Sequence, residues 1–134
     1  MADDKQPDRD VFVVGGPEDG YTFRGTLKAE GKPPLGFAYR PALPEKVYQY
    51  RMAVRAAETG EQHFAAVATL LGAHVLRWDV KERGANGQPV PLAFSAGALE
   101  RPEVRRALGT DYLDQMVNYV TGYTAGQWDA DAKN

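Results

Sequence analysis

The spacing of apolar residues changes at Pro44, and this change constrains the fold more than any other feature of the sequence. Before Pro44, Tyr21 and Phe23 alternate with polar residues, which is typical of a β-strand with one buried face. After Pro44, apolar residues recur every three or four positions, as they do on the buried side of an α-helix. We therefore expect an α+β fold, with an N-terminal antiparallel β-hairpin or meander followed by a region of three to four helices.

Two or three strands are predicted before Pro44. Residues 11–14 and 21–27 are rich in β-branched and aromatic side chains, and the segment between them contains Gly, Pro and Asp. Such a pattern predicts a β-hairpin. A second turn at residues 30–34 leads to residues 36–40, which predict a third strand with its aromatic side chains on one face.

The first two predicted helices form an αα-hairpin. Pro44 favours a helix start, because proline has no N–H and the first turn of a helix needs none. The helix that it opens ends before Gly60. The second helix is expected to run from about Glu61 to Trp78 or Lys81.

The chain after this hairpin predicts a connection and two shorter helices. Residues 84–87 end the second helix, and residues 88–92 contain two prolines, which predict an extended segment rather than a central strand. A helix at residues 103–108 ends at Gly109. Another begins at Thr110 or Asp111 and carries the next apolar stripe.

The chain of 134 residues fits one domain. Residues 1–10 are acidic and almost free of apolar side chains, so we expect a disordered N-terminal tail. The folded α+β domain is predicted to span residues 11–125, and residues 126–134 to form a disordered C-terminal tail.

The charge and the cysteine content exclude several classes of protein. Sixteen basic and 18 acidic residues give a net charge of -2, which does not predict nucleic-acid binding. The absence of cysteine excludes disulfides and thiol catalysis. No apolar run approaches the roughly 20 residues of a membrane span, and the N-terminus does not resemble a signal peptide. We therefore expect a cytoplasmic protein that contacts no membrane.

The titratable residues do not predict a catalytic or metal site. His63 and His74 are eleven residues apart on one predicted helix, which separates them by roughly 16 Å, too far to share a metal ion. The basic residues Arg101, Arg105 and Arg106 are interpreted as a solvated helix face. No catalytic, metal-binding or cofactor-binding residue is assigned, and no cofactor is expected. An enzyme with an unfamiliar site remains a minor alternative.

Aromatic residues are the best candidates for contacts with another protein. Tyrosine and tryptophan are enriched at interfaces, where the ring is buried and its polar group stays hydrated. The alternative is that these rings edge the core of the domain itself. The candidates are Tyr48, Trp78, Tyr119, Tyr123 and Trp128.

Residues 71–80, with the sequence LGAHVLRWDV, and residues 87–92, with the sequence GQPVPL, resemble segments of small tail-module proteins of tailed phages and prophages, especially tail assembly chaperones. In that pattern a helix ends in Trp, Asp and an apolar residue, and a Gly-x-Pro-Val-Pro turn follows. A short segment and a terminal helix complete it, here at residues 102–109 and 111–124. The resemblance covers about residues 36–124.

The resemblance implies a non-enzymatic protein that binds the tape-measure protein of a tail and helps to recruit tail-tube subunits. A structural virion component, such as a head–tail connector or tail-terminator subunit, is the alternative, because the predicted β-rich start departs from a mostly helical chaperone. The sequence leaves the oligomeric state open.

Overall fold

The computed structural model describes residues 21–129. Within this range it contains a four-stranded antiparallel sheet, a separate two-stranded hairpin and four helices. The predicted α+β class, with antiparallel strands before a helical region, is confirmed. The predicted strand at residues 11–14 and the N-terminal tail lie outside the described residues.

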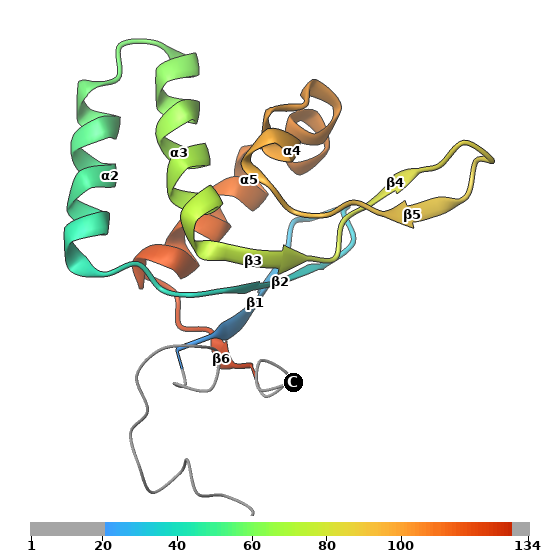
Figure 1. Cartoon of the computed structure of the whole chain (residues 1–134), viewed down its shortest axis with the longest axis horizontal. Coiled ribbons are helices and arrows are strands. Elements are labelled where there is room, and N and C mark those ends of the chain that lie inside the picture. Colours follow the sequence, from blue (N-terminus) through green and yellow to red (C-terminus); the bar gives the residue numbers. More distant parts are fainter. Residues whose placement is uncertain (1–20, 130–134) are drawn as a thin grey trace, which may run out of the picture.

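The sheet has the strand order β3-β2-β1-β6. β1 (Phe23–Leu27) and β2 (Leu35–Tyr39) correspond to the predicted strands at residues 21–27 and 36–40 and pair with each other, with Phe23 opposite Tyr39 and Leu27 opposite Leu35. The helices all lie over one face of this sheet (Figure 1). Buried side chains on that face include Leu27, Phe37 and Tyr39, so the core lies between sheet and helices.

The αα-hairpin consists of α2 (Pro44–Ala56) and α3 (Gly60–His74). Pro44 stands in the first turn of α2, as predicted. The Thr59 hydroxyl accepts a hydrogen bond from the Gln62 N–H and so caps α3.

The predicted extension of the second helix to Trp78 is wrong. α3 ends at His74, and Val75–Trp78 forms β3, an edge strand paired with β2. The register between β2 and β3 shifts at Ala38 and Tyr39, so Leu76 has no direct partner. This irregularity lets Val75 and Trp78, three residues apart, both be buried. The predicted helix was extended to Trp78 because Val75 and Trp78 are three residues apart, a spacing that is also typical of one side of a helix.

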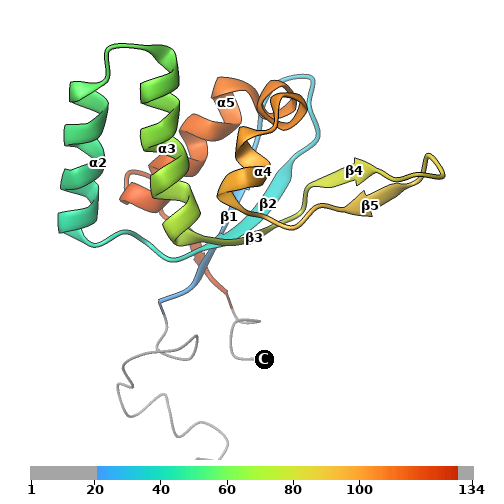
Figure 2. The same cartoon turned by 45° about the horizontal axis from the view of Figure 1, so that its top comes forward.

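The segment after β3 forms a hairpin of β4 (Lys81–Arg83) and β5 (Pro89–Pro91). It corrects the prediction that the helix reaches Lys81. The hairpin, called the arm below, extends away from the body on the side opposite α2 (Figures 1 and 2). The Trp78 indole N–H donates to the Leu92 carbonyl at 2.6 Å and holds the base of the arm.

Two further helices complete the domain. α4 (Ala96–Glu100) is capped by the Ser95 hydroxyl, which accepts from the Ala98 N–H. α5 (Pro102–Thr121) is kinked at Gly109, where the backbone is not helical: φ is 66° and ψ is -179°. The predicted break between two helices at Gly109 is therefore confirmed as a kink.

The predicted disordered tail from residue 126 needs correction. Gln127–Trp128 forms β6, which pairs with β1 at the second edge of the sheet. Asp129 is fully buried, and its carboxylate lies 2.5 Å from the Arg77 guanidinium. The ordered domain therefore reaches Asp129, and residues 130–134 lie outside the described part.

Candidate functional site

Helix α2 is unusual because it contributes no buried residue to the domain. The helix packs on α3, and its half-buried side chains are Val47, Tyr50 and Val54. Burial raises the pKa of the Tyr50 hydroxyl, and the charge of Asp114 adds to this effect. The rest of α2 stands at the edge of the molecule (Figures 1 and 2). A groove therefore opens on each side of the helix.

The first groove, called the α2–α5 groove, lies between α2 and the end of α5 and encloses about 450 Å³. One of its walls carries the exposed ring of Tyr48 and the side chain of Arg51. The Arg51 guanidinium donates to the Tyr123 hydroxyl at 2.5 Å and lies 5.4 Å from the centre of that ring. The lining residues are Ala42, Pro44, Val47, Tyr48, Arg51 and Thr121.

One of the five predicted protein-binding residues, Tyr48, lines this groove, and a second, Tyr123, contacts Arg51 in its wall. Tyr48 is 64% exposed and Tyr123 is 72% exposed, and Arg51 contacts the second while lining the groove with the first. Leu43, just before α2, and Met52, within α2, add exposed apolar surface. Large exposed apolar side chains that gather on one surface are typical of binding sites rather than of solvated helices.

Two other predicted residues are engaged inside the domain. Trp78 is 7% exposed and packs edge-on against Phe94, with ring centres 5.0 Å apart. Tyr119 packs edge-on against Phe37, and its hydroxyl donates to the Thr26 carbonyl at 3.3 Å. Their positions fit the alternative interpretation from the sequence, in which the aromatic rings edge the core.

The last candidate, Trp128, lies on the edge strand β6 and lines neither groove. It is 44% exposed on β6, opposite Phe23 of β1. Its ring is available at the sheet edge, but the structure does not bring it to the α2–α5 groove.

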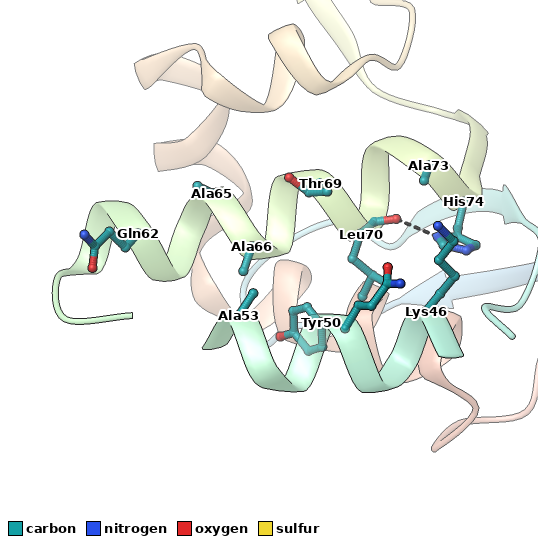
Figure 3. Close-up of a pocket in the computed structure, with 11 residues that line it drawn as sticks. Lys46, Tyr50, Ala53, Gln62, Ala65, Ala66, Thr69, Leu70, Ala73 and His74 are labelled. Carbon is teal, nitrogen blue, oxygen red and sulfur yellow. Dashed lines mark hydrogen bonds between the residues drawn. The ribbon is translucent and has the colours of Figure 1, made fainter. Parts of the chain in front are cut away.

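The second groove, called the α2–α3 groove, lies between the two helices of the αα-hairpin and encloses about 380 Å³ (Figure 3). Its lining is mostly small or apolar. Figure 3 shows Lys46 and His74 at one end and Gln62 at the other. The lining residues are Lys46, Gln49, Tyr50, Ala53, Gln62, Ala65, Ala66, Thr69, Leu70, Ala73 and His74.

The charged residues of α2 itself are mainly positive. The helix contains Lys46, Arg51 and Arg55 against a single acid, Glu45, which gives a net charge of +2, whereas the whole chain has -2. Within residues 21–129, Arg51 and Arg55 form no ion pair. No acidic residue lines either groove. Both grooves are therefore apolar with positive charge at their borders.

The other arginine cluster is neutralised by neighbouring acids. Arg101 forms ion pairs with Glu103 at 2.6 Å and Glu82 at 3.0 Å, and these hydrogen bonds raise the pKa of its guanidinium. Arg105 pairs with Glu61 at 3.1 Å and stacks on the Phe64 ring. Arg101 and Arg105, which were interpreted from the sequence as part of a solvated helix face, therefore take part in ion pairs.

The histidines do not meet. His63 is exposed near the start of α3, and the His74 Nδ1 lies 2.8 Å from the Leu70 carbonyl, within its own helix. Residues 21–129 contain no group of three His, Cys, Asp or Glu side chains placed to hold a metal ion. No helix among them is long and apolar enough to cross a membrane.

The α2–α3 groove was not predicted from the sequence, although a signal for it exists. Residues 64–73 contain no charged side chain, in a chain that is 25% charged. Only the buried stripe of a surface helix needs to be apolar, so the remaining small side chains, such as Ala65 and Thr69, indicated a second apolar face.

No protein-family model, curated protein or solved structure matches this chain.

Proposed function

We propose that this protein is a non-enzymatic, chaperone-like assembly factor of a phage or prophage tail. It binds the tape-measure protein, tail-tube subunits or both. The observation that supports binding is the state of α2, which buries no residue of its own and stands between two apolar grooves. The resemblance of residues 71–92 to tail assembly chaperones supplies the choice of partner.

The chemistry of the α2–α5 groove favours a protein partner. Tyr48 and Tyr123 offer large flat apolar surfaces with a hydroxyl at the edge, and Arg51 lines the groove with Tyr48 and contacts Tyr123. Tyrosine and arginine are the residues whose truncation most often weakens protein interfaces. Met52, on the next turn after Tyr48, has a flexible side chain that adapts to different partner surfaces.

A pull-down with the candidate partners tests this proposal. The full chain is co-expressed with the tape-measure or tail-tube protein encoded beside it, and retention is measured for wild type, Tyr48→Ser and Leu76→Ser. Leu76 is an exposed apolar residue on β3 and serves as the control. We expect Tyr48→Ser to weaken binding about tenfold or more, as at other interface hot spots, and Leu76→Ser to leave it unchanged. Failure of the wild type to retain either protein refutes the assigned partners.

The arm favours a second candidate, a structural virion component such as a head–tail connector or tail-terminator subunit. It reaches beyond the body of the domain, as an element that contacts a neighbouring subunit would (Figure 1). The molar mass measured by light scattering separates the two candidates. A ring of many subunits in dilute solution favours the connector, and a monomer or small oligomer favours the chaperone.

A further inference from the structure

The α2–α3 groove has a shape that could accommodate a third helix. Its floor and walls carry alanines and one threonine, including Ala53, Ala66 and Thr69, so a docked backbone can approach closely. From Gln62 to His74 the groove follows about 18 Å of helix, at 1.5 Å per residue. Thus about three turns of a partner helix fit along it.

The ends of the groove are chemically different. Lys46 and His74 lie together at one end, and Gln62 lies at the other (Figure 3). The ammonium group of Lys46 forms no ion pair with residues 21–129. A partner that places a carboxylate beside Lys46 gains an ion pair, whereas a lysine there is repelled.

We propose that the α2–α3 groove binds an amphipathic helix of the partner protein, with small and aliphatic residues facing the groove and acidic residues flanking them. This inference rests on the proposed function and assigns the chemistry of the partner. Lys46 favours the acidic flank, because it is the only Lys, Arg, Asp or Glu among the described residues that line this groove.

Two synthetic peptides provide the probe. Each has about 18 residues, enough to span the groove, with leucine and alanine at helical positions i, i+3, i+4 and i+7. One carries glutamate at the flanking positions and its twin carries lysine. Binding to the full chain is measured by fluorescence anisotropy at low and high salt. We expect the glutamate peptide to bind about tenfold more tightly than its twin at low salt, and salt to reduce the difference.

Matched variants locate the binding. Ala65→Trp fills the groove from an exposed position, and Ala56→Trp places the same ring on an exposed position of α2 that lines neither groove. We expect Ala65→Trp to raise the Kd of the glutamate peptide at least about tenfold and Ala56→Trp to leave it unchanged. Lys46→Glu should raise the Kd about fivefold, whereas Lys81→Glu on the arm should not.

Several results overturn this inference. Equal binding of both peptides refutes the acidic partner, and binding that survives both Ala65→Trp and Lys46→Glu refutes the groove. If neither peptide binds at millimolar concentration, both the acidic partner and the groove as its binding site are refuted. Tighter peptide binding after removal of residues 1–10 identifies that segment as the occupant, and a dimer that Ala65→Trp dissociates identifies a second copy.

The two proposals fail in different ways. A tail protein that is retained equally by wild type and Ala65→Trp refutes the α2–α3 groove and leaves the assembly role intact. Peptide binding that depends on Ala65 and Lys46, without retention of any tail protein, supports the groove and refutes the assigned partners.

Discussion

Replacement of Gly109 by alanine tests whether the kink in α5 is required by packing. On one side of the kink, Val104 and Leu108 are buried, and on the other side Tyr112 and Met116 are buried. Because these positions are four residues apart, a straight helix would also place them along one side, so the kink changes the direction of the second half of α5 rather than which side of it faces the core. The backbone of Gly109 has φ 66° and ψ -179°, a combination that is essentially restricted to glycine.

The cost of Gly109→Ala follows from this geometry. A non-glycine residue in such a conformation costs about 1–3 kcal/mol. In addition, the new Cβ would lie 3.3 Å from the Lys32 ammonium, which donates to the carbonyls of Ala107 and Leu108. Because Lys32 is flexible it can move, but its two hydrogen bonds would weaken. We expect a total destabilisation of about 2–3 kcal/mol.

The assay is equilibrium urea unfolding followed by circular dichroism, with Gly60→Ala as the control. Gly60 lies in the first turn of α3, and a Cβ there meets no atom within 4 Å, so Gly60→Ala should be neutral or slightly stabilising. The opposing effect in Gly109→Ala is helix propensity, which favours alanine over glycine by about 1 kcal/mol. An unchanged or increased free energy of unfolding would show that α5 can straighten, and would refute the argument from packing.

Two further changes test the core. Trp78→Phe removes the donor to Leu92, and should lower the free energy of unfolding by about 1–3 kcal/mol in urea titrations; no loss would show that the arm is held by other contacts. Burial, with a contribution from the charge of Tyr119, raises the pKa of Tyr39 from 10.0 to about 12. Because the folded state holds this proton more tightly than the unfolded state does, the protonated Tyr39 contributes to the free energy of unfolding. That contribution is complete below pH 10 and is lost as pH rises from 10 to 12. Unfolding at pH 8 and pH 11 should therefore show a smaller decrease for Tyr39→Phe than for wild type, and equal decreases would contradict the assignment.

Local signals predicted the helices well where a single residue determines the backbone. Pro44 starts α2, and Gly109 interrupts α5 at the expected position. Both residues act through their own backbone preferences, so the start of α2 and the kink in α5 can be predicted without the tertiary structure. The apolar spacing around them then identifies the buried side, as the burial of Met116 and Val120 shows.

Apolar spacing was misleading at Val75 and Trp78. The irregular pairing of β2 with β3 places residues three apart on the same side of a strand, and this imitates one turn of a helix. Strand irregularities depend on the partner strand, which lies more than 30 residues away in the chain. The sequence of residues 75–78 alone therefore could not distinguish the two structures.

The two prolines of residues 88–92 predicted an extended segment, but they did not predict that it pairs with β4 in the arm. In β5, Pro89 and Pro91 lie opposite Arg83 and Lys81, while the hydrogen bonds between the strands involve the alternate positions, including Leu92 N–H to the Val80 carbonyl. The missing N–H groups therefore point outward and no bond within the hairpin is lost. The same arrangement leaves the outer edge of β5 without donors, which protects it from pairing with another strand.

The aromatic candidates were separated by tertiary contacts that the sequence does not contain. Tyr119 and Tyr123 are four residues apart and would share a face in a continuous helix, but α5 ends at Thr121. Tyr119 therefore reaches the core, whereas Tyr123 turns to the surface beside Arg51. Composition can select tyrosines as interface residues, but the end of the helix decides which of them remain exposed.

The state of α2 explains why its binding surfaces were only partly predicted. Its stripe of Val47, Tyr50 and Val54 is the pattern of a helix that packs on a core, yet these side chains are only half-buried. An apolar stripe in the sequence indicates that a helix packs against other residues, but it does not indicate how completely those residues bury it. An isolated helix of 13 residues is marginal in water, so α2 depends on its packing against α3 and on its few other contacts. A partner that covers either groove would therefore add to the stability of α2 as well as gain affinity from its exposed apolar surface.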